Sequence, residues 1–258
     1  METVNPQKAH YEAVHEAYAD HYYDGESLAY RRKFIMQPLL EGIEAKGWLV
    51  ADLACGSGYN SLLLREMKPG LELEGFDISD KAAADYRRLV GPAHVADLTL
   101  PFDAEARFDA VLVVGGLHHC VANLPQTLAN IAGLVKPGGY LLMAEPNKRY
   151  ILQFLRSIWY RRDRYFDADT EEALDHAQIL GLGRPWFEEE KLVYLGGPAY
   201  FLVLNSLILR LPKPVKSLLA PVLMGLERVY NALPLPGCFY PVFCARWKRT
   251  EVSRVSPH

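Results

Sequence analysis

The chain has 258 residues, half of them hydrophobic, with a formal net charge of -3 and an isoelectric point of about 6.2. This composition is ample for a folded core, and it lacks the basic excess of a nucleic-acid-binding protein, so we expect no nucleic acid partner. The four cysteines form no CxxC pair, so we expect no metal site. The N-terminus has no apolar signal-peptide core, and the apolar stretch 198–209 is too short to span a bilayer, so we expect a cytoplasmic protein.

Four regions follow from the patterns along the chain. Apolar and aromatic residues at helical spacing predict an N-terminal helical cover over residues 1–46, with a break at Gly25. Alternating strand and helix patterns predict an α/β core over 47–147. The less regular segment 148–236 is interpreted as a helical substrate-lid insert, and 237–258 as a final strand and a loose tail.

The α/β core is predicted to be a doubly wound, mostly parallel sheet with helices on both faces. Its buried strands are expected at 47–54, 71–79, 93–99, 108–116 and 140–147, with helices between them. Ligands of such sheets bind beyond the carboxyl ends of the strands, where the strand order reverses. In the insert, the pattern after residue 211 predicts a helix kinked or broken at Pro221.

The stretch VADLACGSGYN, residues 50–60, lies where such a ligand is expected. Gly56 and Gly58 would let a ligand approach the backbone, and Asp77, at the end of the second strand, is placed to accept hydrogen bonds from ribose hydroxyls. A nicotinamide dinucleotide and S-adenosylmethionine both contain a ribose. Asp52 would repel a pyrophosphate, whereas it would favour the ammonium and sulfonium of S-adenosylmethionine.

Five segments, taken in order, resemble a class I S-adenosylmethionine-dependent methyltransferase of the small-molecule type. They are VADLACGSGYN, LEGFDIS, HVADLTLPF, FDAVLVVGGLHHCV and LVKPGGYLLMAEPN. The resemblance implies a Rossmann-like sheet of seven strands whose last strand runs antiparallel, and CFYPVFCARWK is the candidate for that strand. It also implies S-adenosylmethionine as the cofactor and S-adenosylhomocysteine as the product.

The resemblance assigns cofactor-binding roles residue by residue. The glycine loop falls on Asp52, Ala54, Gly56 and Gly58. The acid that binds the ribose falls on Asp77, with Ile78 beside the adenine, and the acid at the adenine edge falls on Asp97, next to Leu98. The backbone that receives the methionine ammonium falls on Val114 and Gly115, and the aromatic and the arginine from the cover fall on Tyr22 and Arg31. Where the family often has glycine, this chain has Ala54. We expect its methyl group to be tolerated if the residue keeps a negative φ.

Three residues beyond the strand ends are candidates for catalysis. His118 and His119 follow the fourth strand and could act as a general base, since histidine titrates near neutral pH. Glu145 ends the fifth strand and could orient a substrate. Each has a structural alternative: a histidine could pack under the cofactor, and Glu145 could hold a loop by hydrogen bonds.

These features predict an enzyme that methylates O or N of a small metabolite, of hydrophobic or aromatic character and from secondary metabolism. The alternatives are a methyltransferase for a lipid-linked or quinone-like acceptor at a membrane surface, a non-catalytic cofactor-binding partner subunit, and a nicotinamide oxidoreductase. The apolar insert fits a greasy pocket, a peripheral membrane contact, or a helical subdomain or dimer contact. The oligomeric state is expected to be a monomer or a homodimer.

Overall fold

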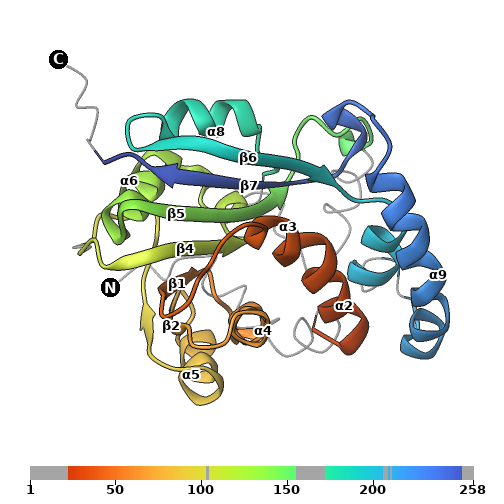
Figure 1. The fold of residues 1–258 in the computed structure, drawn as a ribbon, viewed down its shortest axis with the longest axis horizontal. Coiled ribbons are helices and arrows are strands. Elements are labelled where there is room, and N and C mark those ends of the chain that lie inside the picture. The colour runs from red at the N-terminus through yellow and green to blue at the C-terminus, as the bar shows by residue number, and fades with distance from the viewer. Residues whose placement is uncertain (1–22, 103–104, 155–171, 206–208, 210, 252–258) are drawn as a thin grey trace, which may run out of the picture.

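The computed structural model describes residues 23–102, 105–154, 172–205, 209 and 211–251, and Figure 1 shows their arrangement. A seven-stranded sheet runs through the molecule in the order β3-β2-β1-β4-β5-β7-β6. Neighbouring strands pair in parallel except at β7, which runs antiparallel to both β5 and β6. The strands are β1 (Leu49–Leu53), β2 (Glu72–Asp77), β3 (Ala93–Val95), β4 (Phe108–Val114), β5 (Val135–Pro146), β6 (Phe187–Leu195) and β7 (Val242–Arg249). The predicted fold class is confirmed.

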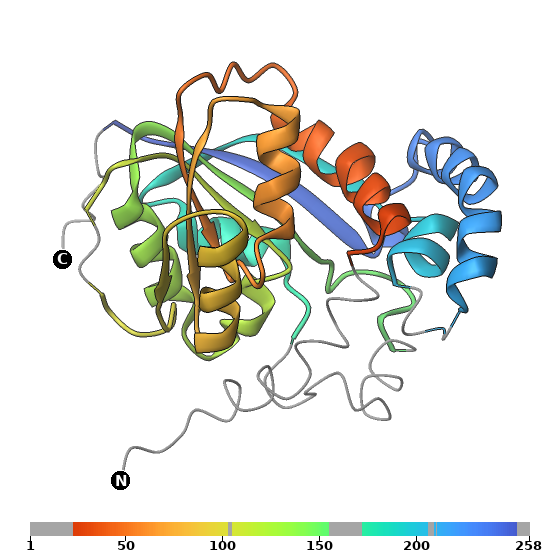
Figure 2. The ribbon, with the colours of Figure 1, turned by 90° about the horizontal axis from the view of Figure 1, so that it is seen from below.

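Helices cover both faces of the sheet, because alternate strand residues point to opposite sides. Val50 and Leu112 pack on one face with the N-terminal helices and α9, and Ala51 and Val111 pack on the other with α6 and α8. Figure 2 shows α2 and α6 on opposite sides of the sheet. The α-helices are α2 (Gly25–Tyr30), α3 (Gln37–Leu40), α4 (Tyr59–Met67), α5 (Asp80–Leu89), α6 (Leu124–Leu134), α8 (His176–Gly183) and α9 (Lys213–Asn231).

The strand order reverses between β1 and β4, and this reversal sets the place of the site. From β1 the chain winds outward through β2 and β3, then returns to pair β4 with the other edge of β1. The loops after β1 and β4 therefore leave in opposite directions and open a crevice at the carboxyl ends of the strands.

The N-terminal cover is helical from Gly25, and its first 22 residues lie outside the described part of the chain. Gly25, where a break was expected, is the first residue of α2. Asp24 caps this helix, since its Oδ1 accepts a hydrogen bond of 2.9 Å from the Ser27 backbone N–H. The cover continues as a π-helical turn, η1 (Arg31–Met36), before α3. Such turns are rare and occur often at functional sites.

The predicted helical insert 148–236 is only partly helical, and this prediction is corrected. It contains α8 and the strand β6, which pairs with β7 along the edge of the sheet. The sequence pattern of β6 did not reveal a strand because Phe187 and Leu195, at its two ends, are buried while Glu188 to Glu190 face solvent. The sequence also predicts an amphipathic helix with a basic face over 150–166, and residues 155–166 of it lie outside the described part of the chain.

The sequence predicted a helix kinked or broken at Pro221, and of these the break is corrected. α9 runs without interruption for 19 residues, with Pro221 inside it and exposed. A proline removes one backbone hydrogen bond from a helix interior, and tertiary packing must offset that loss. Here Ala220 and Leu223, on either side of the proline, are buried against the rest of the molecule.

Candidate active site

A cavity of about 240 Å³ opens at the carboxyl ends of the central strands. Its wall combines the loops after β1, β2, β3 and β4 with η1, the end of β5 and the π-helical turn η4 (Tyr200–Leu204). Of the residues proposed from the sequence, the structure brings to this wall Arg31, Ala54, Gly56, Asp77, Ile78, Asp97, Leu98, Val114, Gly115, His118, His119 and Glu145. It does not bring Asp52 or Gly58 there, and Tyr22 lies outside the described residues.

The two glycines of the first loop have different structural roles. A Cβ at Gly56 would meet no heavy atom within 4 Å, so this residue leaves space at the cavity wall. A Cβ at Gly58 would lie 2.5 Å from Val90 and 2.7 Å from Tyr86, so this residue permits close packing of α4 on α5. Both have positive φ, 53° and 87°, which glycine adopts at low cost.

Ala54 does not keep the negative φ on which the expected tolerance of its methyl group depended. Its φ is +50°, so a residue with a side chain occupies the left-handed region of the backbone. For a non-glycine residue this conformation costs roughly 1–2 kcal/mol. The surrounding loop enforces the strain, since the Cys55 N–H donates to the Phe76 carbonyl at 3.2 Å and the Gly58 N–H to the Cys55 carbonyl at 3.0 Å.

Asp77 organises the junction of two loops while it lines the cavity. Its Oδ2 accepts a hydrogen bond of 2.8 Å from the Gly56 N–H, and its Oδ1 accepts one of 2.9 Å from the Ser79 N–H. Asp97 follows the next strand, β3, and is held within its own loop. Its Oδ1 accepts hydrogen bonds from the backbone N–H and the hydroxyl of Thr99. Both carboxylates are therefore held in fixed orientations, with Ile78 and Leu98 beside them in the wall.

Asp52 lies behind the wall instead of in it. Its side chain is buried, and its Oδ2 accepts a hydrogen bond of 2.8 Å from the Ser61 hydroxyl of α4. Burial raises the pKa of the Asp52 carboxyl to about 7, with a further contribution from nearby Asp77. The position fits a structural acid beneath the glycine loop better than a direct partner for a ligand.

Arg31 and Tyr23 close the cavity from the helical side. Arg31 is 8% exposed, its Nη1 donates to the Asn60 Oδ1 at 3.3 Å, and its guanidinium lies 4.8 Å from the centre of the Tyr23 ring. Its Nε is buried and finds no hydrogen-bond partner in the described part of the protein. Tyr23, the neighbour of the candidate Tyr22, lines the cavity wall.

Glu145 fixes the loop after β4 from below. This buried side chain accepts hydrogen bonds from the Gly116 N–H at 2.9 Å, the Leu117 N–H at 2.8 Å and the His118 N–H at 3.3 Å. Its Oε2 also lies 2.8 Å from the His118 Nδ1. Burial raises the pKa of the Glu145 carboxyl to about 7, although the backbone donors lower it. The ring of His119 contacts that of His118 in a tilted arrangement, with centroids 3.8 Å apart and an angle of 41° between the planes.

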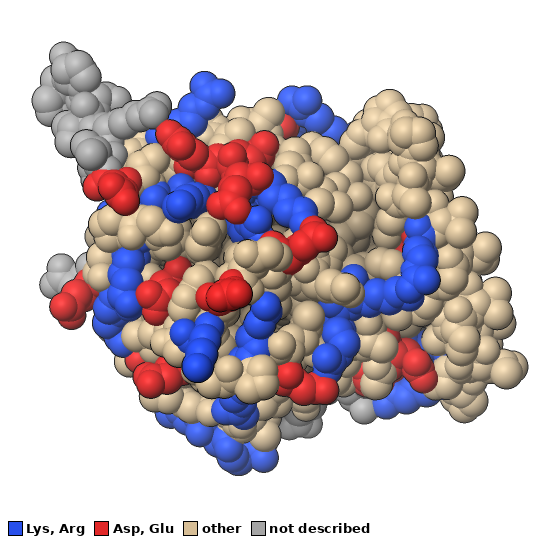
Figure 3. Space-filling view, in the orientation of Figure 1, with Lys and Arg blue, Asp and Glu red and all other residues tan. Residues whose placement is uncertain are grey.

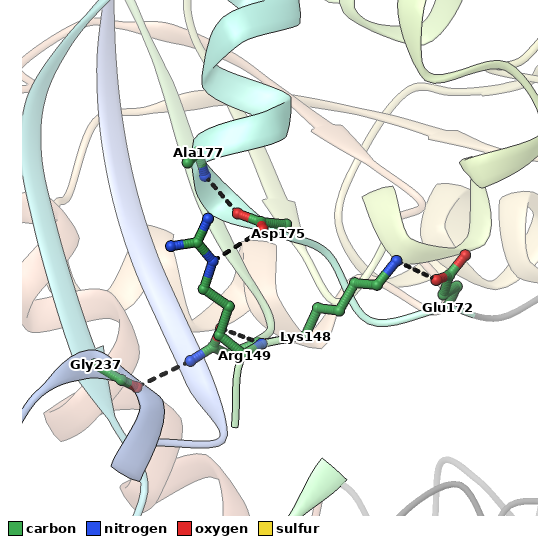
Figure 4. Close-up of polar contacts among 7 residues, drawn as sticks. Lys148, Arg149, Glu172, Asp175, Ala177 and Gly237 are labelled. Carbon is green, nitrogen blue, oxygen red and sulfur yellow. Dashed lines mark hydrogen bonds and ion pairs between the residues drawn. The ribbon is translucent and has the colours of Figure 1, made fainter. Parts of the chain in front are cut away.

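The residues after Glu145 fasten the end of β5 to the C-terminal part of the chain. The Asn147 Nδ2 donates to the Gly237 carbonyl at 3.0 Å and to the Tyr240 carbonyl at 2.9 Å. Figure 4 shows that the next two residues form ion pairs with the segment before α8. Lys148 pairs with Glu172, and Arg149 pairs with Asp175, the N-cap of α8. These contacts hold the end of β5 in place beside the cavity.

For the far end of the cavity, the sequence suggested an apolar pocket in the insert as one alternative, but it did not identify Ile35, Leu204, Asn205 or Val242 as lining residues. It is lined by Ile35, Tyr200, Leu204, Asn205 and Val242, from η1, η4 and β7. The loop that leads into η4 is held by Glu227 of α9, a fully buried carboxylate. It accepts hydrogen bonds from the N–H groups of Gly197 and Ala199, both at 2.9 Å, and from the Tyr30 hydroxyl at 2.7 Å. A glutamate within an otherwise apolar helical pattern was the signal that could have found this anchor.

The cavity fits the cofactor that the sequence resemblance implies. S-adenosylmethionine carries a carboxylate, and Arg31, a buried cation whose Nε has no hydrogen-bond partner among the described residues, lies in the cavity wall. The open side of Gly56 provides room against the backbone, and Asp77 presents carboxylate oxygens at a strand end.

Comparisons with known proteins agree with this geometry. A family model described as a methyltransferase domain matches residues 51–143. Glycine N-methyltransferase of Rattus norvegicus is 30% identical over 233 residues, covering 69% of this chain and 78% of that protein. Demethylmenaquinone methyltransferase of Symbiobacterium thermophilum is 32% identical over 111 residues, covering 39% of this chain and 43% of that protein.

A solved structure has the same fold. It is an S-adenosylmethionine-dependent methyltransferase of Thermotoga maritima, described as a possible histamine N-methyltransferase, with a TM-score of 0.63 at 13% identity. It covers 95% of this chain and 99% of its own. These matches set aside the nicotinamide alternative. The chain belongs to the class I S-adenosylmethionine-dependent methyltransferases and is an enzyme that uses S-adenosylmethionine as its cofactor.

Proposed function

We propose that this enzyme transfers a methyl group to an oxygen or nitrogen of a small hydrophobic or aromatic acceptor. The observation that carries the proposal is the apolar far end of the cavity, where Ile35, Leu204 and Val242 meet the ring of Tyr200. Asn205 adds a polar group that could orient the acceptor. Pockets of this kind, mostly apolar with few polar groups, are typical of small-molecule sites.

The strand ends would hold the cofactor. Asp77 is proposed to accept hydrogen bonds from the ribose hydroxyls, and Asp97 to receive the adenine edge between Ile78 and Leu98. The backbone at Val114 and Gly115 would receive the ammonium group, and Arg31 the carboxylate. The bound cofactor supplies an activated methyl group on a sulfonium, so the protein needs mainly to position the acceptor.

His118 is proposed as the general base for a hydroxyl acceptor, and Glu145 as its positioning residue. When Nδ1–H is donated to Glu145, the lone pair of the imidazole resides on Nε2. The base would take the acceptor proton as the new bond to carbon forms. General-base help of this kind contributes roughly a hundred- to ten-thousandfold in rate. His119 would support the ring of His118 through the tilted contact between the two rings.

A glycine acceptor, the substrate that the rat relative's name gives, fits this cavity less well. Glycine brings a second carboxylate, which would need a cation of its own. Arg31 is the one lysine or arginine of the described residues in the cavity wall, and the cofactor carboxylate would occupy it. The quinone-like acceptor named for the demethylmenaquinone enzymes is a closer match in polarity, and the surface described below bears on it.

The test is transfer of a labelled methyl group from S-adenosylmethionine to panels of acceptors matched in size. We expect turnover with phenols or apolar amines and none with glycine. Turnover with glycine alone would contradict the proposed acceptor class. As a test of the cofactor end, Asp77→Ala should weaken S-adenosylhomocysteine binding about 10- to 100-fold in calorimetry, because a charged hydrogen bond contributes roughly 1.5–3 kcal/mol. Unchanged affinity in a folded variant would rule out the ribose role.

A further inference from the structure

The long helix α9 has its two faces reversed. Its inward stripe contains two ionisable residues, Lys216 at 1% exposure and Glu227 at 0%, beside Ala220 and Leu223. Its outward stripe, which we call the α9 face, is apolar and exposed. The face consists of Val215, Leu218, Leu219, Val222, Leu226, Val229 and Leu233, which directly follows the helix. A surface helix of a globular protein usually turns its apolar stripe inward, so the reversal calls for an external apolar partner.

The inward charges fix the helix in this orientation. The Lys216 Nζ contacts both carboxylate oxygens of Asp24, at 2.8 and 2.7 Å, and the Ser27 hydroxyl at 2.7 Å. Glu227, three turns further on, holds Tyr30 and the loop before η4. Rotating α9 to hide its apolar face would expose Ala220 and Leu223. It would also break the polar contacts of Lys216 and of Glu227. The exposed face is therefore a stable feature of the fold.

The charges on the outside of α9 are all positive. Lys213 in its first turn and Arg228 in its last turn are its exposed ionisable residues, since Lys216 and Glu227 are buried. Figure 3 shows the right-hand margin of the molecule, which α9 forms, as largely uncharged, while acidic and basic side chains gather over the sheet. An apolar face with cations and no exposed acid matches an anionic lipid surface, where basic side chains stay at the headgroups.

More exposed apolar side chains surround the C-terminal end of α9. Ile151 and Phe154 are 50% and 58% exposed, and Phe239 is 37% exposed. The Ile151 N–H donates to the Cys238 carbonyl at 2.8 Å, and the Tyr230 hydroxyl of α9 donates to the Phe239 carbonyl at 2.9 Å. The apolar surface therefore continues past the helix onto the segment that follows β5.

The α9 face lies directly outside the acceptor end of the cavity. Tyr200, Leu204 and Asn205 of the η4 segment line that end, and Glu227 joins the start of η4 to α9. Figure 1 shows α9 as the outermost element on this side, beyond α2. A surface that covers α9 would therefore lie next to the acceptor side rather than the cofactor side of the site.

We propose that the α9 face docks on an anionic lipid surface and brings the acceptor end of the cavity next to the bilayer. Among the described residues no helix has the length and apolar content to cross a membrane, so the contact is peripheral. A second copy of the chain fits less well. An antiparallel pair of α9 helices would place Lys213 of each copy near Arg228 of the other, with no exposed acid on the helix to offset them. That the acceptor comes from the lipid rests on the proposed function, whereas the docking itself does not.

The test is flotation of the full chain with unilamellar vesicles made from equal parts of phosphatidylcholine and phosphatidylglycerol. We expect the wild type to float with these vesicles and much less with pure phosphatidylcholine. The double variant Leu218→Asp and Val222→Asp should lower the bound fraction at least about tenfold, since both side chains leave water on docking. The matched control, Val95→Asp and Leu100→Asp, changes two exposed apolar residues elsewhere and should bind as the wild type does.

Three outcomes would overturn the docking. The wild type could fail to float, the α9 variant could float as well as the wild type, or sedimentation velocity could show a dimer that the α9 variant dissolves. Thermal unfolding shows whether the variants remain folded. Methyl transfer to a water-soluble apolar acceptor without vesicles tests the proposed function separately, because the α9 variant should keep that activity.

Discussion

Two buried glutamates hold the two ends of the cavity by the same means. At the cofactor end, Glu145 of β5 accepts three backbone N–H groups from the loop that carries His118. At the acceptor end, Glu227 of α9 accepts three from the loop that leads into η4. A buried carboxylate is stable when several donors surround it, and it then fixes the loop that supplies them.

The difference between them lies in what else each carboxylate touches. Glu145 contacts a histidine in the cavity wall, so changing it should alter catalysis. Glu227 contacts Tyr30 and the backbone, so changing it should alter stability and the shape of the acceptor end. With His118 as the proposed base, the same arrangement would serve catalysis at one end and stability at the other, and substitutions can separate the two roles.

The largest expected effect is on stability. Glu227→Ala leaves the N–H groups of Gly197 and Ala199 and the Tyr30 hydroxyl without their acceptor, which should lower the free energy of unfolding by about 3–5 kcal/mol. Urea denaturation measures this loss. Arg228→Ala, at the exposed neighbour, is the control and should change stability by less than about 0.5 kcal/mol. Equal losses for the two variants would refute the anchoring role.

The second effect concerns Asp52, a buried carboxylate with a hydroxyl donor from Ser61 and no backbone donor in the described chain. Its folded pKa of about 7 lies above the unfolded value near 3.9, so the folded state holds the proton more tightly. Its contribution to stability is complete below about pH 4 and is lost as the pH rises to about 7. Asn cannot ionise, so Asp52→Asn should remove this pH-dependent loss of stability. The loss amounts to about 2–4 kcal/mol of the free energy of unfolding at pH 8.

Urea denaturation of the apo protein from pH 4 to pH 8 measures this difference. Glu72→Gln, at an exposed acid on the neighbouring strand β2, is the control and should follow the wild-type profile. If the free energy of unfolding of Asp52→Asn follows the same pH profile as the wild type, the Asp52 carboxylate is not buried as described.

Catalysis is the third way to separate the two glutamates. Glu145→Gln keeps the shape of the side chain but loses the anion beside His118, so kcat should fall about a hundredfold. Since burial raises the pKa of the Glu145 carboxyl to about 7, the wild-type rate should rise as the pH increases through 7, and the variant should lose this step. Glu227→Gln is the matched control: it should change the KM for the acceptor more than kcat. Identical kinetics for the two variants would contradict the division of roles.

The smallest effect lies in the first loop, where Ala54 and Gly56 have nearly the same φ, 50° and 53°. Ala54→Gly should raise the free energy of unfolding by about 1 kcal/mol, because the strain of the left-handed backbone disappears. Gly56→Ala should lower it by a similar amount and also weaken cofactor binding, since its methyl group would point into open space at the cavity wall. Urea denaturation of both variants checks the opposite signs; a loss for both would show that Ala54 is not strained.

The cofactor end was predictable because it is local. Each of its loops directly follows a strand, so Gly56, Asp77 and His118 could be placed from strand patterns, and the family resemblance added Asp97. The backbone angle of Ala54 could not be predicted, because the turn around it sets that angle. Asp52 and Gly58 were identified as part of the loop, but whether they face the cavity depends on how α4 packs against α5.

The acceptor end was not predictable for the opposite reason. Glu227 meets Gly197 and Tyr30 across 30 and 197 residues of chain, and neither contact leaves a local pattern. The edge strand β6 was hidden by its exposed acidic residues. The apolar content of α9 was visible in the sequence, but an apolar helix is normally assumed to turn that face inward.

The most direct measurement is a crystal structure of the enzyme with S-adenosylhomocysteine. The proposed function predicts ribose hydroxyls on Asp77, the amino-acid carboxylate on Arg31, and the sulfur directed toward the space between His118 and Tyr200. A nucleoside bound elsewhere, or a sulfur turned away from the apolar end, would contradict it.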